Sequence, residues 1–224
     1  MYSLRALMPD KASSWRVVDS AFELSAPSIA ECPAQGVPEI AVAGRSNVGK
    51  SSLLNAICGQ RSLARVSRTP GRTRLLNFFA VRLRGPSGDL ALRLVDLPGY
   101  GFAVAERSVR ASFGPMIEGF FAGRGALCGL LLLVDARRDI QEPELQLLEY
   151  MSRRQLPTLL CATKVDKLKA GERGLVAAKL AKRVGVAPRD VLLTSARDRI
   201  GLGADDRFGG LPDQMARLVS GEVA

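Results

Sequence analysis

The chain has 224 residues, of which 47% are hydrophobic, and a formal net charge of +10; this composition fits one large domain with a substantial core. It has no histidine, and its four cysteines do not form a CxxC pair, which argues against a zinc site or disulfide framework and excludes Ser-His-Asp and Cys-His catalysis. The longest apolar run, residues 126–134, is too short to span a bilayer, and the first residues lack the apolar core of a secretory signal. We therefore expect a cytoplasmic protein without membrane contact.

The first half of the chain predicts a lead-in followed by strands and a helix. Residues 1–37, rich in Pro, Ala and Ser towards their end, are expected to be irregular and to pack on a single domain of residues 38–224. Residues 39–44 predict a strand and 49–59 a helix, while 74–84 and 90–99 predict two strands joined as a hairpin by the turn at 85–89. Residues 104–124 predict a helix that Gly114 and Pro115 should break or kink.

The second half alternates apolar runs with amphipathic stretches. It predicts strands at 127–136, 156–164 and 190–196 and helices at 143–154, 174–185 and 211–219. This alternation favours an α/β fold with a mostly parallel sheet covered on both faces and one antiparallel hairpin pairing. Ligands bind such sheets at the carboxyl ends of the strands.

A phosphate-binding loop follows the first predicted strand. Residues 44–51 read G-R-S-N-V-G-K-S and match the pattern G-x-x-x-x-G-K-[ST]. Gly44 and Gly49 permit a tight wrap whose amides point at phosphates near a helix N-terminus. Lys50 supplies charge to the outer phosphates, and the Ser51 hydroxyl is placed to bind magnesium.

Three further segments end later strands. Asp96 opens D-L-P-G, where the carboxylate can hold magnesium through water and the Gly99 amide can bond a terminal phosphate. In T-K-V-D, residues 163–166, Asp166 can accept two parallel hydrogen bonds that guanine offers and adenine does not, while the Lys164 stem can lie along the base. The backbone of T-S-A, residues 194–196, can contact the guanine oxygen.

Together these segments resemble the EngB (YihA/YsxC) GTPases, relatives of Era and EngA in the TrmE-Era-EngA-EngB-septin-like class of Ras-like GTP-binding proteins. The resemblance includes T-P-G-R-T at residues 69–73 and covers about residues 22–196. It weakens at residues 197–215, which are longer and richer in Gly and Asp than the link expected before a final helix.

The resemblance implies a Ras-like P-loop GTPase fold with a six-stranded, mostly parallel sheet, one antiparallel strand and helices on both faces. It implies binding of GTP and GDP with Mg²⁺, slow hydrolysis, and a switch function in assembly of the large ribosomal subunit. The partner would be the subunit precursor, through rRNA or ribosomal proteins, and the protein would be needed for normal cell division and septation. We expect a monomer.

The resemblance also assigns site residues. It implies Lys50, Thr73 and Gly99 as catalytic residues and Ser51 and Thr73 as magnesium ligands; of the two candidate threonines, Thr69 and Thr73, the pattern P-G-R-T selects Thr73. The implied GTP contacts are Gly44, Arg45, Ser46, Asn47, Val48, Gly49, Lys50, Ser51, Gly71, Arg72, Thr73, Arg74, Leu75, Asp96, Leu97, Pro98, Gly99, Thr163, Lys164, Val165, Asp166, Thr194, Ser195 and Ala196.

The basic charge is concentrated in one stretch. Residues 40–88 contain nine cations and no Asp or Glu, and such a field attracts phosphate polymers. One hypothesis is an RNA contact ordered by GTP; the alternatives are a merely solvated surface, a protein-binding regulator of division without RNA contact, and a phosphate-loop kinase, which T-K-V-D disfavours. Base stacking is open to four aromatic residues, although one of the first two is expected in the core: Phe78, Phe79, Tyr100 and Phe102.

Hydrolysis is expected to be intrinsically slow. Tyr100 stands where Ras-like switches carry a water-orienting glutamine. Potassium can offset the charge that develops in the transition state, with Asn47 as a ligand; the alternative is that Asn47 only hydrogen-bonds its own loop.

Overall fold

The structure is a computed structural model that describes residues 14–59, 75–99, 109–203 and 210–222, without the side chains of residues 109–114. Its described strands form one seven-stranded sheet in the order β1-β3-β4-β2-β5-β6-β7. The strands are β1 (Arg16–Ala26), β2 (Glu39–Gly44), β3 (Leu76–Gly85), β4 (Gly88–Asp96), β5 (Leu127–Asp135), β6 (Thr158–Thr163) and β7 (Val191–Leu193). β3 is antiparallel to both of its neighbours and the remaining pairs are parallel, as predicted for a mostly parallel sheet with one antiparallel strand.

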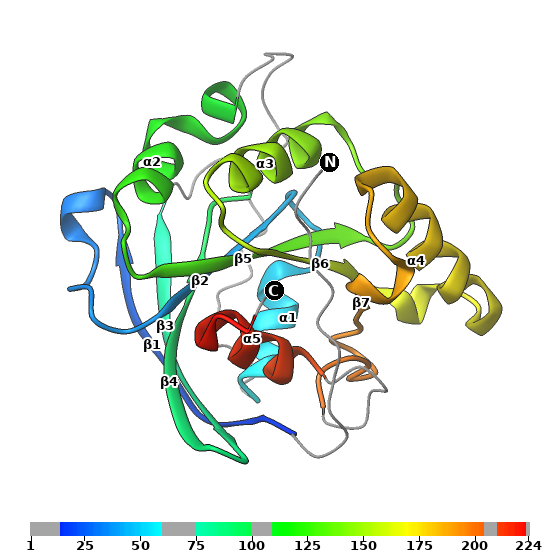
Figure 1. The fold of residues 1–224 in the computed structure, drawn as a ribbon, viewed down its shortest axis with the longest axis horizontal. Helices are drawn as coiled ribbons and strands as arrows, with labels where there is room; N and C mark the ends of the chain where they lie inside the picture. The colour runs from blue at the N-terminus through cyan, green and yellow to red at the C-terminus, as the bar shows by residue number, and fades with distance from the viewer. Residues whose placement is uncertain (1–13, 60–74, 100–108, 204–209, 223–224) are drawn as a thin grey trace.

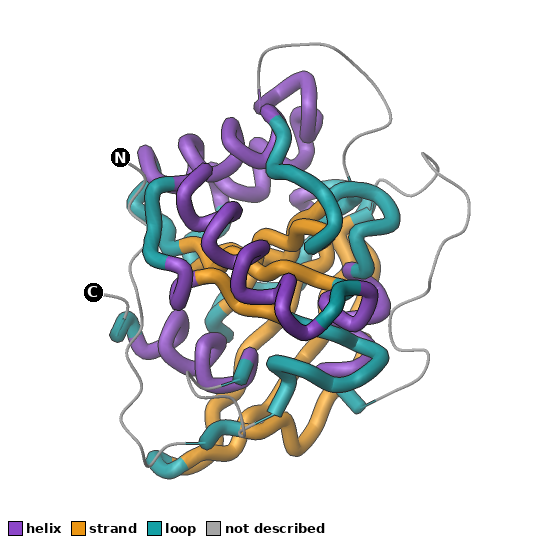
Figure 2. The backbone as a smooth tube through the Cα atoms, turned by 90° about the vertical axis from the view of Figure 1, so that its right-hand side faces the viewer, coloured by secondary structure: helices purple, strands orange, loops and turns teal. Residues whose placement is uncertain are grey.

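Helices cover both faces of the sheet (Figures 1 and 2). α2 (Val109–Gly123), α3 (Glu142–Arg153) and α4 (Ala170–Val184) pack on one face, and α1 (Lys50–Ile57) and α5 (Leu211–Ser220) on the other. None of the helices in the described residues is long and apolar enough to cross a membrane.

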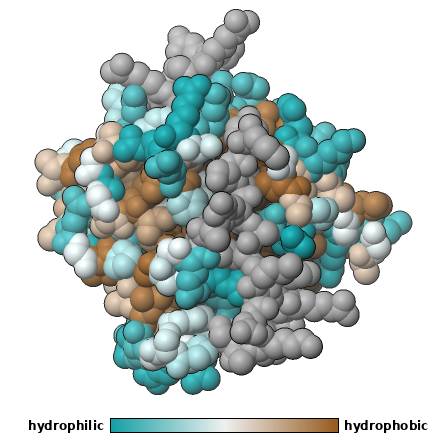
Figure 3. Space-filling view, viewed as in Figure 1, coloured by the Kyte–Doolittle hydropathy of each residue, from teal (hydrophilic) through white to brown (hydrophobic). Residues whose placement is uncertain are grey.

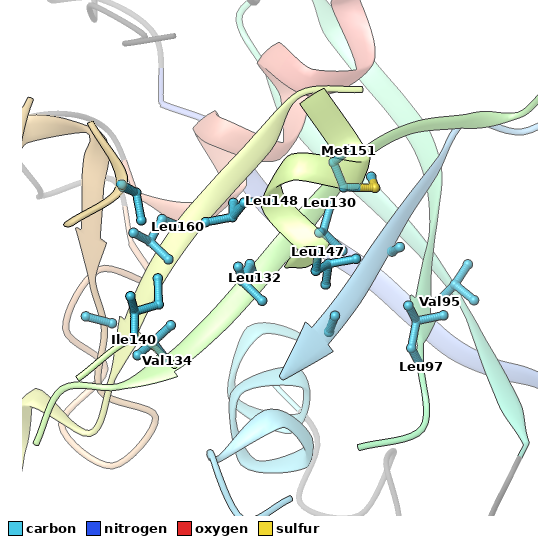
Figure 4. Close-up of a cluster of buried hydrophobic side chains, with 14 of the residues drawn as sticks. Val95, Leu97, Leu130, Leu132, Val134, Ile140, Leu147, Leu148, Met151 and Leu160 are labelled. Atoms are coloured by element: carbon cyan, nitrogen blue, oxygen red, sulfur yellow. The ribbon is translucent and has the colours of Figure 1, made fainter. Parts of the chain in front are cut away.

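The two faces explain why the central strands are apolar without interruption. All six residues of β2 are buried, and alternate residues face opposite cores. Ala41 and Ala43 join the core under α2–α4, whereas Ile40 and Val42 join the core under α1 and α5. Figure 4 shows the first core, where α3 packs on β5 and β6 through Leu130, Leu132, Leu147, Leu148, Met151 and Leu160.

The sheet has one strand more than the six expected. The additional strand is β1, which lies in the segment predicted to be irregular and pairs with β3 along its length. Its pairing register shifts between Val17 and Asp19 and again between Phe22 and Leu24. These two bulges interrupt the alternation of period two, so the sequence carries no clear strand pattern.

Helix α2 continues through Pro115, so of the predicted break or kink the break does not occur. A proline removes one backbone hydrogen bond and crowds the preceding turn, at a cost of about 3 kcal/mol. Three large side chains after the proline, Ile117, Phe120 and Phe121, are buried in the core. Their burial offsets that cost, because each contributes roughly 1.5–3 kcal/mol.

A buried ion pair fastens the N-terminal segment to the sheet. Glu39, at the start of β2, is fully buried, and Arg124 donates to its two carboxylate oxygens over 2.8 and 2.7 Å. Arg124 also donates to the Pro33 carbonyl over 2.7 Å. Nearby, Arg93 donates to both carboxylate oxygens of Glu23 in β1 over 2.8 Å. These bonds connect β1 and the following loop to the amino end of the central strand.

We predict that Glu39→Gln destabilises the protein by about 3–5 kcal/mol, because it leaves the buried Arg124 charge without a counter-charge. The measurement is urea unfolding followed by circular dichroism. Glu149→Gln is the matched control, since Glu149 pairs with Arg153 on the surface at 52% side-chain exposure and such pairs contribute at most about 1 kcal/mol. Equal midpoints for the two variants would contradict the prediction.

Candidate functional site

The sequence motifs meet along the carboxyl edge of the sheet. The phosphate loop follows β2, D-L-P-G begins at the last residue of β4, T-K-V-D begins at the last residue of β6, and T-S-A follows β7. Because β4, β2, β5, β6 and β7 are successive neighbours, four segments far apart in the sequence come to one edge (Figure 1). This is where open α/β sheets bind ligands.

The phosphate loop requires glycine at both ends for different reasons. A Cβ atom at Gly44 would lie 2.8 Å from Val48 Cγ1 and 3.1 Å from Leu133 Cβ, so the close wrap of the loop excludes a side chain. Gly49 has φ +110°, a left-handed conformation that favours glycine. Asn47 also has a positive φ, +63°, which asparagine tolerates better than most residues. α1 begins directly after this wrap, at Lys50.

The D-L-P-G segment lies against the phosphate loop. Lys50 Nζ forms an ion pair with Asp96 Oδ1 in which both side chains are largely buried. A Cβ atom at Gly99 would lie 3.4 Å from the backbone nitrogen of Ser46. Leu97 is buried in the core and its amide donates to the Val42 carbonyl over 3.0 Å. Lys50, Asp96 and Gly99 are therefore brought together as predicted.

The T-K-V-D segment, residues 163–166, also contacts the phosphate loop. The Thr163 hydroxyl donates to the Val48 carbonyl over 2.7 Å, and Lys164 Nζ donates to the Asn47 carbonyl over 2.5 Å. Lys164 has φ +61°, which turns the chain sharply after β6. Val165 is fully buried and its amide donates to the Thr194 carbonyl over 3.2 Å. The segment thus joins the phosphate loop to the T-S-A segment.

Asp166 is held in place by the T-S-A segment. The Ser195 hydroxyl donates to Asp166 Oδ1 over 2.8 Å and accepts the Asp198 amide over 3.0 Å. Burial raises the pKa of Asp166, but hydrogen bonds, with that from Ser195 the strongest, and the nearby Lys167 bring it below its usual range. The carboxyl is therefore ionised at neutral pH and acts only as an acceptor. Thr194 is fully buried and its hydroxyl donates to the Ala162 carbonyl over 3.2 Å, so its side chain supports the sheet.

Some predicted site residues lie outside the described part of the chain. They are Gly71, Arg72, Thr73 and Arg74, together with Tyr100, Phe102 and the competing Thr69. Leu75 is described and directly precedes β3. Phe78 and Phe79 are both buried, at 0% and 1% exposure. The expectation that one is in the core thus holds for both, and neither is available for stacking on bases.

A cavity of about 470 Å³ opens between the phosphate loop and the segment after β5. Its lining includes Asp135 and Arg137, which lie outside the sequence motifs. Asp135 ends β5, the strand between β2 and β6. Its position immediately after the longest apolar run was the signal that would have placed it at the same edge as the motifs.

Comparison with known proteins identifies the family. Residues 39–164 match the family described as 50S ribosome-binding GTPase. Over 200 residues the chain is 40% identical to the probable GTP-binding protein EngB of Lactobacillus gasseri, covering 89% of this chain and 100% of that protein. The chain belongs to the EngB family of GTPases.

Other members of the EngB family agree. The chain is 44% identical over 166 residues to the probable GTP-binding protein EngB of Geobacter sulfurreducens, covering 74% of this chain and 77% of that protein. A crystal structure of a probable GTP-binding protein EngB has the same fold, with a TM-score of 0.51 and 21% identity over 83% of this chain and 98% of that one. The chain is therefore a GTP-binding GTPase, and the alternative of a metabolite kinase has no support.

We predict that Asp166→Asn weakens GDP binding about 100-fold, because two charge-assisted hydrogen bonds to guanine are lost. The variant should favour xanthosine diphosphate, whose exocyclic carbonyl oxygen at C2 needs a donor opposite it. The measurement is fluorescence titration with both diphosphates. Asp198→Asn is the control, because Asp198 lies at the same sheet edge with a half-exposed side chain. Wild-type protein that binds ATP as tightly as GTP would refute the assignment.

Proposed function

We propose that this GTPase is a switch that acts on the precursor of the large ribosomal subunit in the cytoplasm and supports normal cell division and septation. The matched family is described as ribosome-binding, and this observation carries the proposal. The acid-free basic stretch at residues 40–88 fits a partner rich in phosphate. The protein acts as a monomer whose first switch, residues 71–75, is ordered by GTP and released after hydrolysis.

The two described arginines of the β3–β4 hairpin have acidic neighbours. Arg82 lies 3.3 Å from Asp89 and 3.4 Å from Asp19, and Arg84 lies 2.7 Å from Asp89. Figure 3 shows the hydrophilic lower end of the molecule, where Figure 1 places the β3–β4 hairpin. Because aspartates accompany the hairpin arginines, the proposed RNA contact is made by the arginines of residues 61–74.

The residues around the phosphate loop fit a magnesium ion. Asp96 offers a carboxylate next to Lys50 at the end of β4, and Ser51 offers a hydroxyl in the first turn of α1; oxygen donors of this kind suit Mg²⁺. Ser51 and Thr73 would bind the ion directly and Asp96 through water. The bound ion supplies neutralisation of the charge on the outer phosphates.

Lys50 and the Gly99 amide stabilise the terminal phosphate, while Thr73 makes the first switch sensitive to it. The remaining GTP contacts are those of the phosphate loop, residues 44–49, with Gly71, Arg72, Arg74 and Leu75 from the switch. Leu97 and Pro98 contribute after β4, and the T-K-V-D and T-S-A segments contribute at the base.

We predict that charge reversal at Arg65, Arg68 and Arg74 lowers association with large-subunit precursor particles at least about tenfold in the GTP-analogue state, because phosphate contacts dominate such binding. The measurement is co-sedimentation at increasing salt in the GTP-analogue and GDP states. Wild-type association should fall steeply with salt, and the variant should show a shallower slope.

Charge reversal at Arg82 and Arg84 is the matched control, since these arginines belong to the same stretch but have acidic neighbours. A salt-insensitive association that the first variant leaves unchanged would favour the alternative function, a protein-binding regulator of division without direct RNA contact.

We predict that turnover is slow and faster in potassium than in sodium at equal ionic strength. The Asn47 carbonyl accepts Lys164 Nζ, while the Asn47 side chain is exposed, so its amide oxygen can serve as a cation ligand. Asn47→Ala should abolish the difference between the two ions, measured as phosphate release. Equal wild-type rates in both salts would show that a partner supplies the missing positive charge.

A further inference from the structure

Asp135 lies at the carboxyl end of the strand between the phosphate loop and the T-K-V-D segment, residues 163–166. β5, which Asp135 ends, lies between β2 and β6 (Figure 1). In the pairing of β5 with β6, Asp135 stands beside Thr163, the residue before Lys164. The carboxylate therefore lies where both loops leave the sheet.

Both oxygens of this carboxylate are saturated by cations and a backbone amide. Oδ2 accepts Lys164 Nζ over 3.0 Å and Arg137 Nη2 over 2.7 Å. Oδ1 accepts Arg137 Nε over 2.9 Å and the Arg137 amide over 3.1 Å. The side chain is 7% exposed, and although burial raises the pKa of Asp135, the bonds from Arg137 and Lys164 lower it well below its ordinary range.

Lys164 is consequently fixed by two acceptors from different segments. Its amine bonds the Asn47 carbonyl and the Asp135 carboxylate, and its stem passes the phosphate loop, with Cε 3.5 Å from the position of a Cβ on Gly49. A free lysine carries about 2 kcal/mol of rotamer entropy. Fixing it before the ligand arrives removes a cost that binding would otherwise bear.

We propose that Asp135 is a positioning residue that lengthens the residence time of the guanine nucleotide by holding Lys164 across the phosphate loop. The inference rests on the proposed assignment of Lys164 and Asp166 to the base. Asp135 touches no base atom in this scheme; it acts through Lys164, whose stem forms one wall of the base site. Arg137, whose side chain is 47% exposed, supplies the other hydrogen bonds to the carboxylate from the solvent side.

The rival explanation is that Asp135 only shapes the turn after β5. It accepts the Arg137 amide, and its carbonyl accepts the Arg138 amide over 2.9 Å. A residue that only shapes the turn would affect folding stability. Its effect on nucleotide dissociation would be the same whether or not position 164 carries an amine. The coupling between Asp135 and Lys164 therefore separates the two explanations.

The experiment measures dissociation of a fluorescent GDP analogue by stopped flow from the full-length protein. Asp135→Asn should raise the dissociation rate constant about tenfold, and Lys164→Met, which keeps the stem but lacks the amine, should raise it by a similar factor. The double variant should lie within about twofold of Lys164→Met alone. Asp139→Asn, an exposed acidic residue in the same segment that pairs with Lys179, should behave as wild type.

Three outcomes decide the matter. The proposal would be overturned if Asp135→Asn left the dissociation rate constant unchanged. It would also be overturned if Asp135→Asn raised that rate constant by the same factor in the Lys164→Met background as in the wild type. If Asp135→Asn does not fold, Asp135→Glu, which keeps the charge but displaces it, replaces it in the same cycle with the same expected non-additivity. Asp135→Asn should still prefer guanosine diphosphate over xanthosine diphosphate, and Asp166→Asn should lose this preference. If only the Asp166→Asn result failed, the assignment of the site would be refuted instead of the role of Asp135.

Discussion

The candidate site depends on hydrogen bonds between two loops whose strands are not neighbours in the sheet. β5 separates β2 from β6, yet Thr163 and Lys164 reach the carbonyls of Val48 and Asn47 over 2.7 and 2.5 Å. Because the acceptors belong to the phosphate loop itself, the T-K-V-D segment fixes the backbone of that loop. Displacement of one loop would therefore disturb the other, and the site behaves as one unit.

Charge is arranged symmetrically about this unit. β4 and β5 are the two neighbours of β2 in the sheet, and each ends in an aspartate, Asp96 and Asp135. Each aspartate pairs with a lysine, Asp96 with Lys50 and Asp135 with Lys164. The two carboxylates hold two flexible cations beside the phosphate loop, which is how a polyanion site can be preorganised without a buried unpaired charge.

The sequence predicted the parts of this arrangement that depend on local pattern. Glycine spacing in the phosphate loop, apolar runs in the central strands and Asp166 in T-K-V-D each carry a local physical requirement, and the structure brings these segments to one edge. β1 was not predicted because two bulges interrupt the alternation of its side chains between the two faces of the sheet. Asp135 was not predicted because its distant partner, Lys164, follows another strand, β6, and nothing in the sequence next to Asp135 indicates that contact.

The segment where the family pattern weakens has a structural consequence of its own. The Ser195 amide donates to the Ile200 carbonyl over 3.0 Å, and the Leu211 amide at the start of α5 donates to the Gly201 carbonyl over 2.9 Å. Gly201 has φ +69°, and a Cβ there would lie 2.3 Å from the Leu193 carbonyl oxygen, so only glycine permits this close return. Asp213 in α5 accepts the Trp15 amide over 2.8 Å. The backbone that positions Asp166 is therefore connected through α5 to the residue preceding β1, so both ends of the described chain support the T-S-A segment.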